Sequence, residues 1–169
     1  LSGTPHGQHP YQTLGDLHIK FENQYDIKDY TRSLSLDTAT YQCNYNADGV
    51  AYQREAFISA PDNVLVMRLT AEGEQKINLS ALLSRWHFRD YVTKVSSNSI
   101  MLGGNLGKGG SDFAMILKAS CKGGCVKVIG ENLLIEKADE VILYFTAGTT
   151  FRMTNLKEEL EKTLDLMRI

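Results

Sequence analysis

The chain has 169 residues, and its 18 Lys and Arg against 20 Asp and Glu give a formal net charge of −2. This length suits one domain with a sizeable core, and the near-neutral charge argues against nucleic acid as a partner, which requires a concentrated basic face. No apolar run approaches the roughly 20 residues of a membrane-spanning helix, so no membrane partner is predicted.

Apolar and polar residues alternate in short runs along most of the chain, a pattern typical of antiparallel β-strands. Leu17, Ile19 and Phe21 form the first run, and Leu34 and Leu36 alternate with polar residues in the second. Further candidate strands cover residues 40–45, 50–59, 64–71, 76–83, 91–96, 99–102, 113–120, 125–129, 133–136 and 141–146. Turn signals separate them, among them Asp48-Gly49, which predicts a hairpin, and Pro61-Asp62-Asn63.

Two of these runs, 64–71 and 141–146, are apolar on both faces. Such strands lie in the middle of a sandwich or under a packed neighbour. About a dozen short strands with regular turns predict a mainly β protein, an antiparallel β-sandwich.

The end of the chain switches to helical spacing. Leu156, Leu160, Leu164 and Met167 recur at intervals of three and four residues, which predicts one helix with a single apolar stripe. The stripe needs a surface to cover, and that surface is either this sandwich or a domain beyond residue 169.

The three cysteines are Cys43, Cys121 and Cys125. The Lys-Gly-Gly segment at 122–124 predicts a hairpin that sets Cys121 and Cys125 opposite each other. A disulfide there would close a very short loop and stabilise little, and the odd count favours reduced thiols, which are typical of the cytoplasm. A zinc site would need a second ligand pair at recognised spacing, which the cysteines do not supply.

Two further segments resemble ligand motifs only in part. His6 and His9 have a spacing that could serve a metal, but the prolines and glycine around them indicate an irregular arm with solvated histidines. The glycine-rich run 103–110 lacks the spacing of a phosphate loop and has no Ser or Thr after Lys108. We interpret it as a loop between strands, and neither a metal nor a cofactor is predicted.

The segment 85–91, Arg-Trp-His-Phe-Arg-Asp-Tyr, contains the only tryptophan of the chain. Aromatic faces pack on the C–H faces of sugar rings while polar groups bind the hydroxyls. The candidate carbohydrate contacts are therefore Trp86, His87, Arg89 and Tyr91. The alternative is an aromatic loop packed on the sandwich edge or on a partner.

No Ser/His/Asp arrangement is visible in the sequence, and no pair of catalytic carboxylates can be chosen by spacing, so no catalytic residue is predicted.

Several strands resemble a known family. Residues 10–17 are similar to the Tyr-Gln-Pro-Leu-Gly-Asp-Leu strand of family 95 glycoside hydrolases, the α-L-fucosidase type, with Thr13 in place of the commoner proline. Residues 30–39 resemble that family's Tyr-x-Arg-x-Leu-Asp-Leu-x-Thr-Ala run, with Ser35 in place of Asp. Residues 48–69 and 138–144 also resemble it, so the similarity runs in order through most of positions 10–150.

The resemblance implies an N-terminal β-supersandwich, of the galactose-mutarotase type, that precedes an (α/α)6 catalytic barrel in an inverting hydrolase. Residues 1–153 are then expected to form the sandwich without its first strands, and 154–169 to begin a helical linker. The family's catalytic residues lie in the barrel, so none can be transferred to this chain. The expected partners are the downstream barrel, an oligosaccharide and, through unpaired strand edges, a second copy. The alternatives are a carbohydrate-binding module or a structural scaffold without an enzyme attached.

Overall fold

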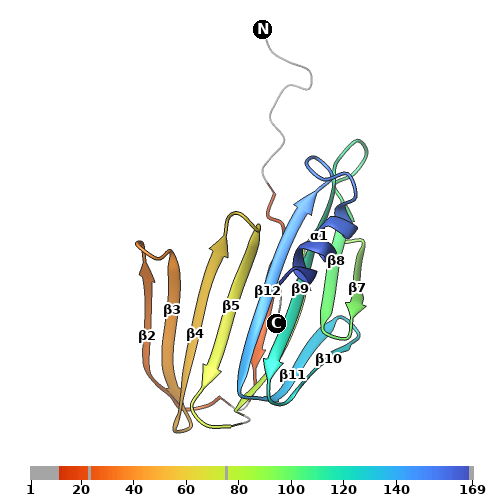
Figure 1. The fold of residues 1–169 in the computed structure, drawn as a ribbon. Helices are drawn as coiled ribbons and strands as arrows, with labels where there is room; N and C mark the ends of the chain where they lie inside the picture. Colours follow the sequence, from red (N-terminus) through yellow and green to blue (C-terminus); the bar gives the residue numbers. More distant parts are fainter. Residues whose placement is uncertain (1–11, 23, 75, 168–169) are drawn as a thin grey trace.

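The computed structural model describes residues 12–22, 24–74 and 76–167, and within these ranges the chain forms twelve strands and one helix (Figure 1). The strands are β1 (Asp16–Phe21), β2 (Ile27–Ser35), β3 (Thr40–Ala47), β4 (Val50–Ser59), β5 (Val64–Ala71), β6 (Ile77–Ser84), β7 (Tyr91–Ser96), β8 (Ser99–Asn105), β9 (Asp112–Lys122), β10 (Cys125–Ile129), β11 (Asn132–Ala138) and β12 (Glu140–Thr149). The helix is α1 (Leu156–Asp165). The predicted mainly β class is confirmed. No helix among the described residues is long and apolar enough to cross a membrane.

The strands form two antiparallel sheets. The larger has the order β2-β3-β4-β5-β12-β9-β8-β7, and the smaller has the order β1-β6-β11-β10. The core lies between them, where alternate residues of most strands point inward; Leu79 and Leu83 of β6 meet Leu117 of β9 and Leu143 of β12 in one cluster. Burial of these side chains supplies the main driving force for folding. The predicted sandwich is therefore confirmed.

The turn signals at 48–49 and 61–63 lie where the chain reverses. β3 and β4 pair up to Ala47 and Val50, and the two residues between them, Asp48 and Gly49, have φ values of 51° and 81°. Positive φ at both central residues is typical of the two-residue hairpin turn that matches strand twist. The hairpin prediction is confirmed.

Helix α1 packs on the outer face of the larger sheet, on the side away from the smaller sheet. Leu156, Leu160 and Leu164 are buried against a cluster that includes Ile116 and Tyr144. The apolar stripe predicted from the sequence therefore covers this sandwich itself.

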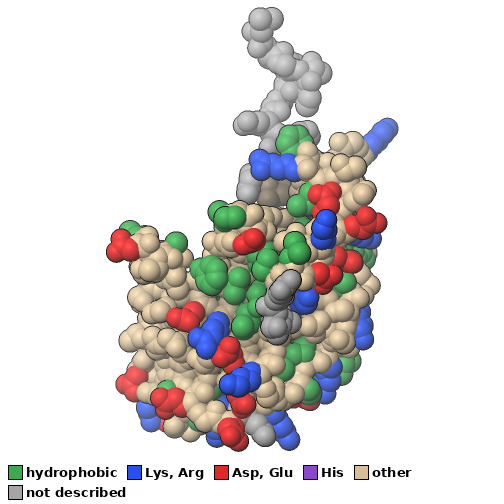
Figure 2. Space-filling view, in the orientation of Figure 1, with side chains coloured by type: hydrophobic (Ala, Val, Ile, Leu, Met, Phe, Trp, Pro, Cys, Tyr) green, Lys and Arg blue, Asp and Glu red, His purple; other side chains and the backbone are tan. Residues whose placement is uncertain are grey.

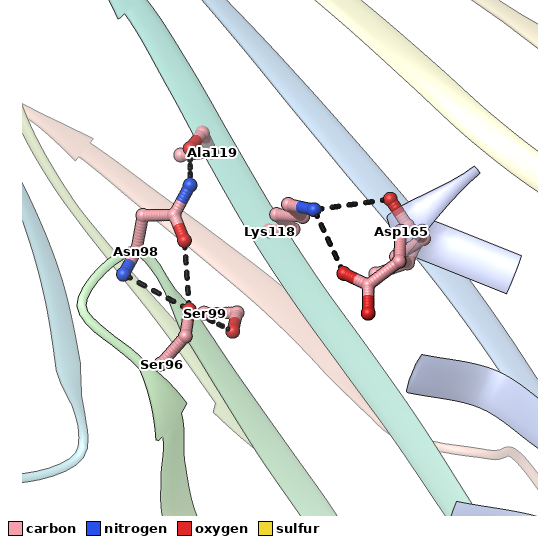
Figure 3. A network of polar contacts seen from close by, with 7 residues as sticks. Ser96, Asn98, Ser99, Lys118, Ala119 and Asp165 are labelled. Atoms are coloured by element: carbon pink, nitrogen blue, oxygen red, sulfur yellow. Dashed lines mark hydrogen bonds and ion pairs between the residues drawn. The ribbon is translucent and has the colours of Figure 1, made fainter. Parts of the chain in front are cut away.

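Lys118, on β9, ties down the last turn of α1. Its Nζ donates to the carbonyl oxygen of Leu164 at 3.1 Å and lies 3.2 Å from Asp165 Oδ1 (Figure 3). A cation at a helix C-terminus satisfies orphan carbonyls and interacts favourably with the helix dipole.

The second alternating run does not behave as predicted. Strand β2 ends at Ser35, and Leu34 and Leu36 are 62% and 86% exposed instead of half-buried. The reason is that no second layer covers β2, which lies at one edge of the larger sheet and has all nine of its residues exposed. Alternation alone does not show whether a strand has a neighbouring layer to pack on.

Candidate carbohydrate-contact loop

Residues 85–90 connect β6 of the smaller sheet to β7 of the larger one, so this loop closes one end of the sandwich. Trp86 is 90% exposed, and its ring meets His87 edge-on at 6.0 Å between centroids. A large aromatic side chain that is almost fully exposed to solvent is uncommon, and it indicates a surface that contacts other molecules.

Arg85 fixes the base of this loop. Its Nη1 donates to the carbonyl oxygens of Thr13 at 2.6 Å and Leu14 at 2.9 Å, while its Nε donates to the carbonyl of His87 at 2.7 Å. The guanidinium also lies 4.2 Å from the centre of the Phe113 ring, and burial lowers the pKa of Arg85. These contacts hold the backbone around Trp86 in place while its ring projects into solvent.

The glycines at 103 and 104 allow strand β8 to approach this loop closely. A Cβ on Gly104 would lie 1.8 Å from the carbonyl oxygen of Phe88, and a Cβ on Gly103 would lie 2.2 Å from Tyr91 Oη. The expectation that residues 103–110 form one loop is therefore wrong for its first three residues, which belong to β8. Glycine is disfavoured in strands, but it marks places where another part of the backbone comes near.

The structure separates the four predicted contact residues. Trp86 and His87 line a hollow of about 380 Å³, whereas Tyr91 lines a different one, of about 440 Å³, beside the start of α1. Lys157 Nζ lies 4.4 Å from the centre of the Tyr91 ring. Arg89 Nη1 lies 3.2 Å from a carboxylate oxygen of Glu131. Only Trp86 and His87 share a surface that a single sugar could contact.

The segment 121–125 is not a hairpin. β9 belongs to the larger sheet and β10 to the smaller one, and Cys121 pairs with Val141 while Cys125 pairs with Glu136. Positive φ values at Gly123 and Gly124 turn the chain from one sheet to the other.

All three cysteines are free thiols. Burial, with a smaller contribution from Cys125, raises the pKa of Cys121, which keeps that thiol protonated and weakly reactive at neutral pH.

Sequence reasoning missed the residues that support the loop. In the sequence, Arg85 stands out only as the first residue of the aromatic segment 85–91, and Phe113 only as part of a candidate strand. The contact between them joins the loop after β6 to strand β9, positions 28 residues apart in the chain, and no local pattern signals it.

Among residues 12–167, apart from 23 and 75, no group of three or more His, Cys, Asp or Glu side chains could hold a metal ion. His6 and His9, which were considered for a metal from their spacing, lie outside the described residues.

Comparison with known proteins identifies the family. The model of the N-terminal domain of glycosyl hydrolase family 65 matches residues 2–154. Alpha-L-fucosidase 2 of Arabidopsis thaliana is 29% identical over 177 residues, which cover 89% of this chain and 21% of that protein. The protein named "Probable alpha-fucosidase A" of Aspergillus niger is 41% identical over 69 residues, 38% of this chain and 9% of that protein.

A solved structure, provisionally titled as a kojibiose phosphorylase from human microbiome, shares the fold, with a TM-score of 0.54 at 14% identity. That likeness covers 89% of this chain and 23% of the other. The fucosidase relatives agree with the resemblance drawn from the sequence, although the matching model carries the name of family 65 and not 95. This chain spans about a fifth of the Arabidopsis relative and belongs to the glycosyl hydrolase family 65 N-terminal domains.

Proposed function

We propose that this chain is the non-catalytic N-terminal domain of a glycoside hydrolase that cleaves α-L-fucosidic linkages with inversion. Residues 1–153 are its β-sandwich, residues 154–169 begin the helical linker, and the catalytic barrel lies outside the chain. The observation that carries the proposal is the match over residues 2–154 to an N-terminal domain, together with relatives named as fucosidases. Most of each relative lies outside the matched region, which is where the resemblance locates the barrel.

An activity assay tests this proposal. The 169-residue chain and the full-length product of its gene are each incubated with an aryl α-L-fucoside and with the matching α-L-galactoside. We expect the full-length product to hydrolyse the fucoside and the isolated chain to release no aglycone. Turnover by the isolated chain at a rate near that of the full-length product would show that the domain is catalytic. A full-length product active only on the galactoside would leave the domain assignment standing and refute the fucose assignment.

The exposed edge of β2 supports a second copy of the chain as a further partner. An edge strand presents unpaired backbone groups that favour strand addition, and all nine residues of β2 are exposed. A strictly monomeric sedimentation profile at the highest soluble concentration would argue against this pairing.

A second candidate function, oligosaccharide contact through the 85–90 loop, is favoured by the exposure of Trp86 on a backbone that Arg85 fixes. A preformed aromatic platform loses little entropy when a sugar ring packs on it. His87, beside it, offers a ring nitrogen for a hydroxyl.

We expect 2′-fucosyllactose to shift the fluorescence of Trp86, which is the only tryptophan and therefore reports on this loop alone. Trp86→Ala should weaken binding about tenfold or more, which corresponds to about 1.4 kcal/mol, as measured by NMR titration. Tyr25→Ala is the matched control, because Tyr25 is also a highly exposed aromatic residue but lies between β1 and β2. An unchanged emission spectrum at millimolar sugar would assign the loop a purely structural role.

A further inference from the structure

The outer face of β2, β3 and β4 is not covered by any other element of the described chain. Helix α1 lies over β12, β9 and β8, and its buried contacts include Met101, Ala114 and Tyr144. Strands β2 to β4 lie beyond β5 on the other side of β12. Figure 2, which shows this face with α1 in front, shows a largely tan surface over these strands, so charged and apolar side chains are sparse there.

Neutral polar side chains form a row across this face. Thr31, Asn44, Gln53 and Thr70 are cross-strand partners on β2, β3, β4 and β5, so their side chains point to the same side. Their strand neighbours, such as Cys43, Tyr45, Tyr52 and Leu69, lie in the core between the sheets. Because successive side chains alternate between faces, the row points outward. We call these four residues the amide row.

The polar side-chain groups of the amide row have no hydrogen-bond partner within the described chain. Its four side chains make no hydrogen bond to any other described residue. The amides beside it are paired instead, since Gln42 Nε2 donates to Glu55 at 3.0 Å and Asn46 Nδ2 donates to Asp29 at 2.8 Å.

Asparagine in the middle of a strand is unfavourable, and β3 carries it at 44 and 46. For Asn44 neither packing nor a hydrogen bond compensates. Positions that break a local rule in this way without a compensating contact are typical of functional sites.

Carboxylates outnumber cations around the amide row, since Arg68 faces both Glu55 and Glu140 and the hollow over the row is also lined by Asp29 and Glu72. Arg68 and Glu55 are partners in the next register row, whereas Glu140 pairs with Thr70 and continues the amide row onto β12. Arg68 Nη2 lies 2.8 Å from Glu140 Oε2, and Arg68 Nη1 lies 3.8 Å from Glu55 Oε2. The hydrogen bond from Arg68 lowers the pKa of Glu140, so that carboxyl stays ionised and paired near neutral pH. The carboxylates disfavour an acidic ligand and can accept hydrogen bonds from hydroxyl groups, so the surface suits a neutral ligand that is rich in hydroxyls.

The face is also hollowed. A depression of about 360 Å³ lies at the amide row, and its lining residues include Asp29, Asn44, Asn46, Gln53, Thr70 and Glu72. A second hollow, of about 300 Å³, is lined by Phe57, Val66 and Tyr144 on the neighbouring strands. Each amide presents a donor and an acceptor side by side, which matches the vicinal hydroxyls of a pyranose.

We propose that the amide row binds a neutral oligosaccharide that lies across β2 to β5. Neighbouring strands are about 4.8 Å apart, close to the length of one sugar ring, so successive strands present polar groups to successive rings. This surface is separate from the 85–90 loop, which precedes β7 at the far edge of the sheet. It goes beyond the proposed function, since binding here needs no catalytic barrel and no particular cleaved linkage.

NMR titration of the ¹⁵N-labelled chain tests the proposal, with 2′-fucosyllactose, cellotetraose and maltotetraose as probes. We expect at least one of them to shift the side-chain NH2 signals of Asn44 and Gln53. The double variant Asn44→Thr/Gln53→Thr should weaken that binding about tenfold or more. Threonine favours strands, so the variant should unfold at the same temperature as the parent chain or higher. Asn132→Thr, an exchange on β11 of the smaller sheet, is the matched control and should bind like the parent.

Three outcomes would overturn this proposal. The first is that none of the three sugars shifts the Asn44 or Gln53 signals at millimolar concentration. The second is that the double variant binds as tightly as the parent. The third is that the shifts are confined to the Trp86 indole, which would assign the sugar to the 85–90 loop and leave the proposed function of the domain intact. Loss of fucosidase activity in the full-length product would bear on the proposed function alone.

Discussion

Leu160→Ala is expected to destabilise the protein by about 3 kcal/mol, within the range of buried leucine truncations. Leu160 is 0% exposed and lies in the middle of the stripe by which α1 packs on the larger sheet. Removing its branched side chain leaves a cavity between helix and sheet, because Met101, Ile116 and the other side chains of that cluster can relax only partly.

Urea unfolding followed by far-ultraviolet circular dichroism measures the effect. Leu166→Ala is the matched control, since Leu166 is largely exposed just after α1, and it should change the unfolding free energy by less than about 0.5 kcal/mol. Hydrogen exchange should also accelerate at the amides of α1 in Leu160→Ala but not in the control. Identical midpoints for the two variants would show that α1 is not docked on the sheet in solution.

Gly104→Ala is expected to cost about 3 kcal/mol and to move the 85–90 loop. The new Cβ would lie 1.8 Å from the Phe88 carbonyl oxygen and 3.0 Å from Phe113 Cζ. The first contact is with backbone, which no side-chain rotation relieves, so either β8 or the loop must shift. Because Trp86 lies two residues from Phe88, its emission should change in the folded protein as well.

Gly109→Ala provides the comparison for this variant. Its Cβ would meet nothing within 4 Å, but its φ of 76° makes alanine unfavourable there by about 1 kcal/mol. We therefore expect a smaller loss of stability and no change in Trp86 emission. If Gly104→Ala kept both the parental stability and the parental emission, the close approach of β8 to the loop would be refuted.

Local patterns predicted most of the strands because a two-residue period reports directly on which face of a strand is buried. The runs at 64–71 and 141–146, apolar on both faces, became β5 and β12. The larger sheet places these two side by side, and α1 packs on that region. The helix itself was also predicted, because Leu156, Leu160, Leu164 and Met167 recur at intervals of three and four residues, which favours a helix.

The same patterns failed where distant segments meet. The glycines at 123 and 124 were read as a hairpin tip, but a Cβ on Gly124 would lie 2.1 Å from the carbonyl oxygen of Glu136, on the strand that pairs with β10. The run at 103–110 predicts a loop because it lies between two candidate strands, yet Gly104 lies in β8 under Phe88. In each case the glycine is required by a neighbour far away in sequence.

The candidate sites divide in a similar way. The sequence singled out Trp86 and His87 through composition alone, and the structure brings them onto one surface. The sequence pattern also grouped Arg89 and Tyr91 with these two residues. In the structure, however, Arg89 lies against Glu131 and Tyr91 lies beside the start of α1. The amide row was not found because Thr31, Asn44, Gln53 and Thr70 become neighbours only through strand register.

By itself, the sequence determined the mainly β class, the helix with its apolar stripe and the hairpin at 48–49. It also determined the likeness to α-L-fucosidase-type hydrolases. Each of these features depends on residues that are close together in the chain or on the order of the residues. Only the tertiary structure decided which strand pairs with which, where the chain crosses between sheets and which faces stay uncovered. Alternation specifies the buried side of a strand but not its neighbour, because the hydrogen bonds that join strands are made by backbone groups that every sequence shares.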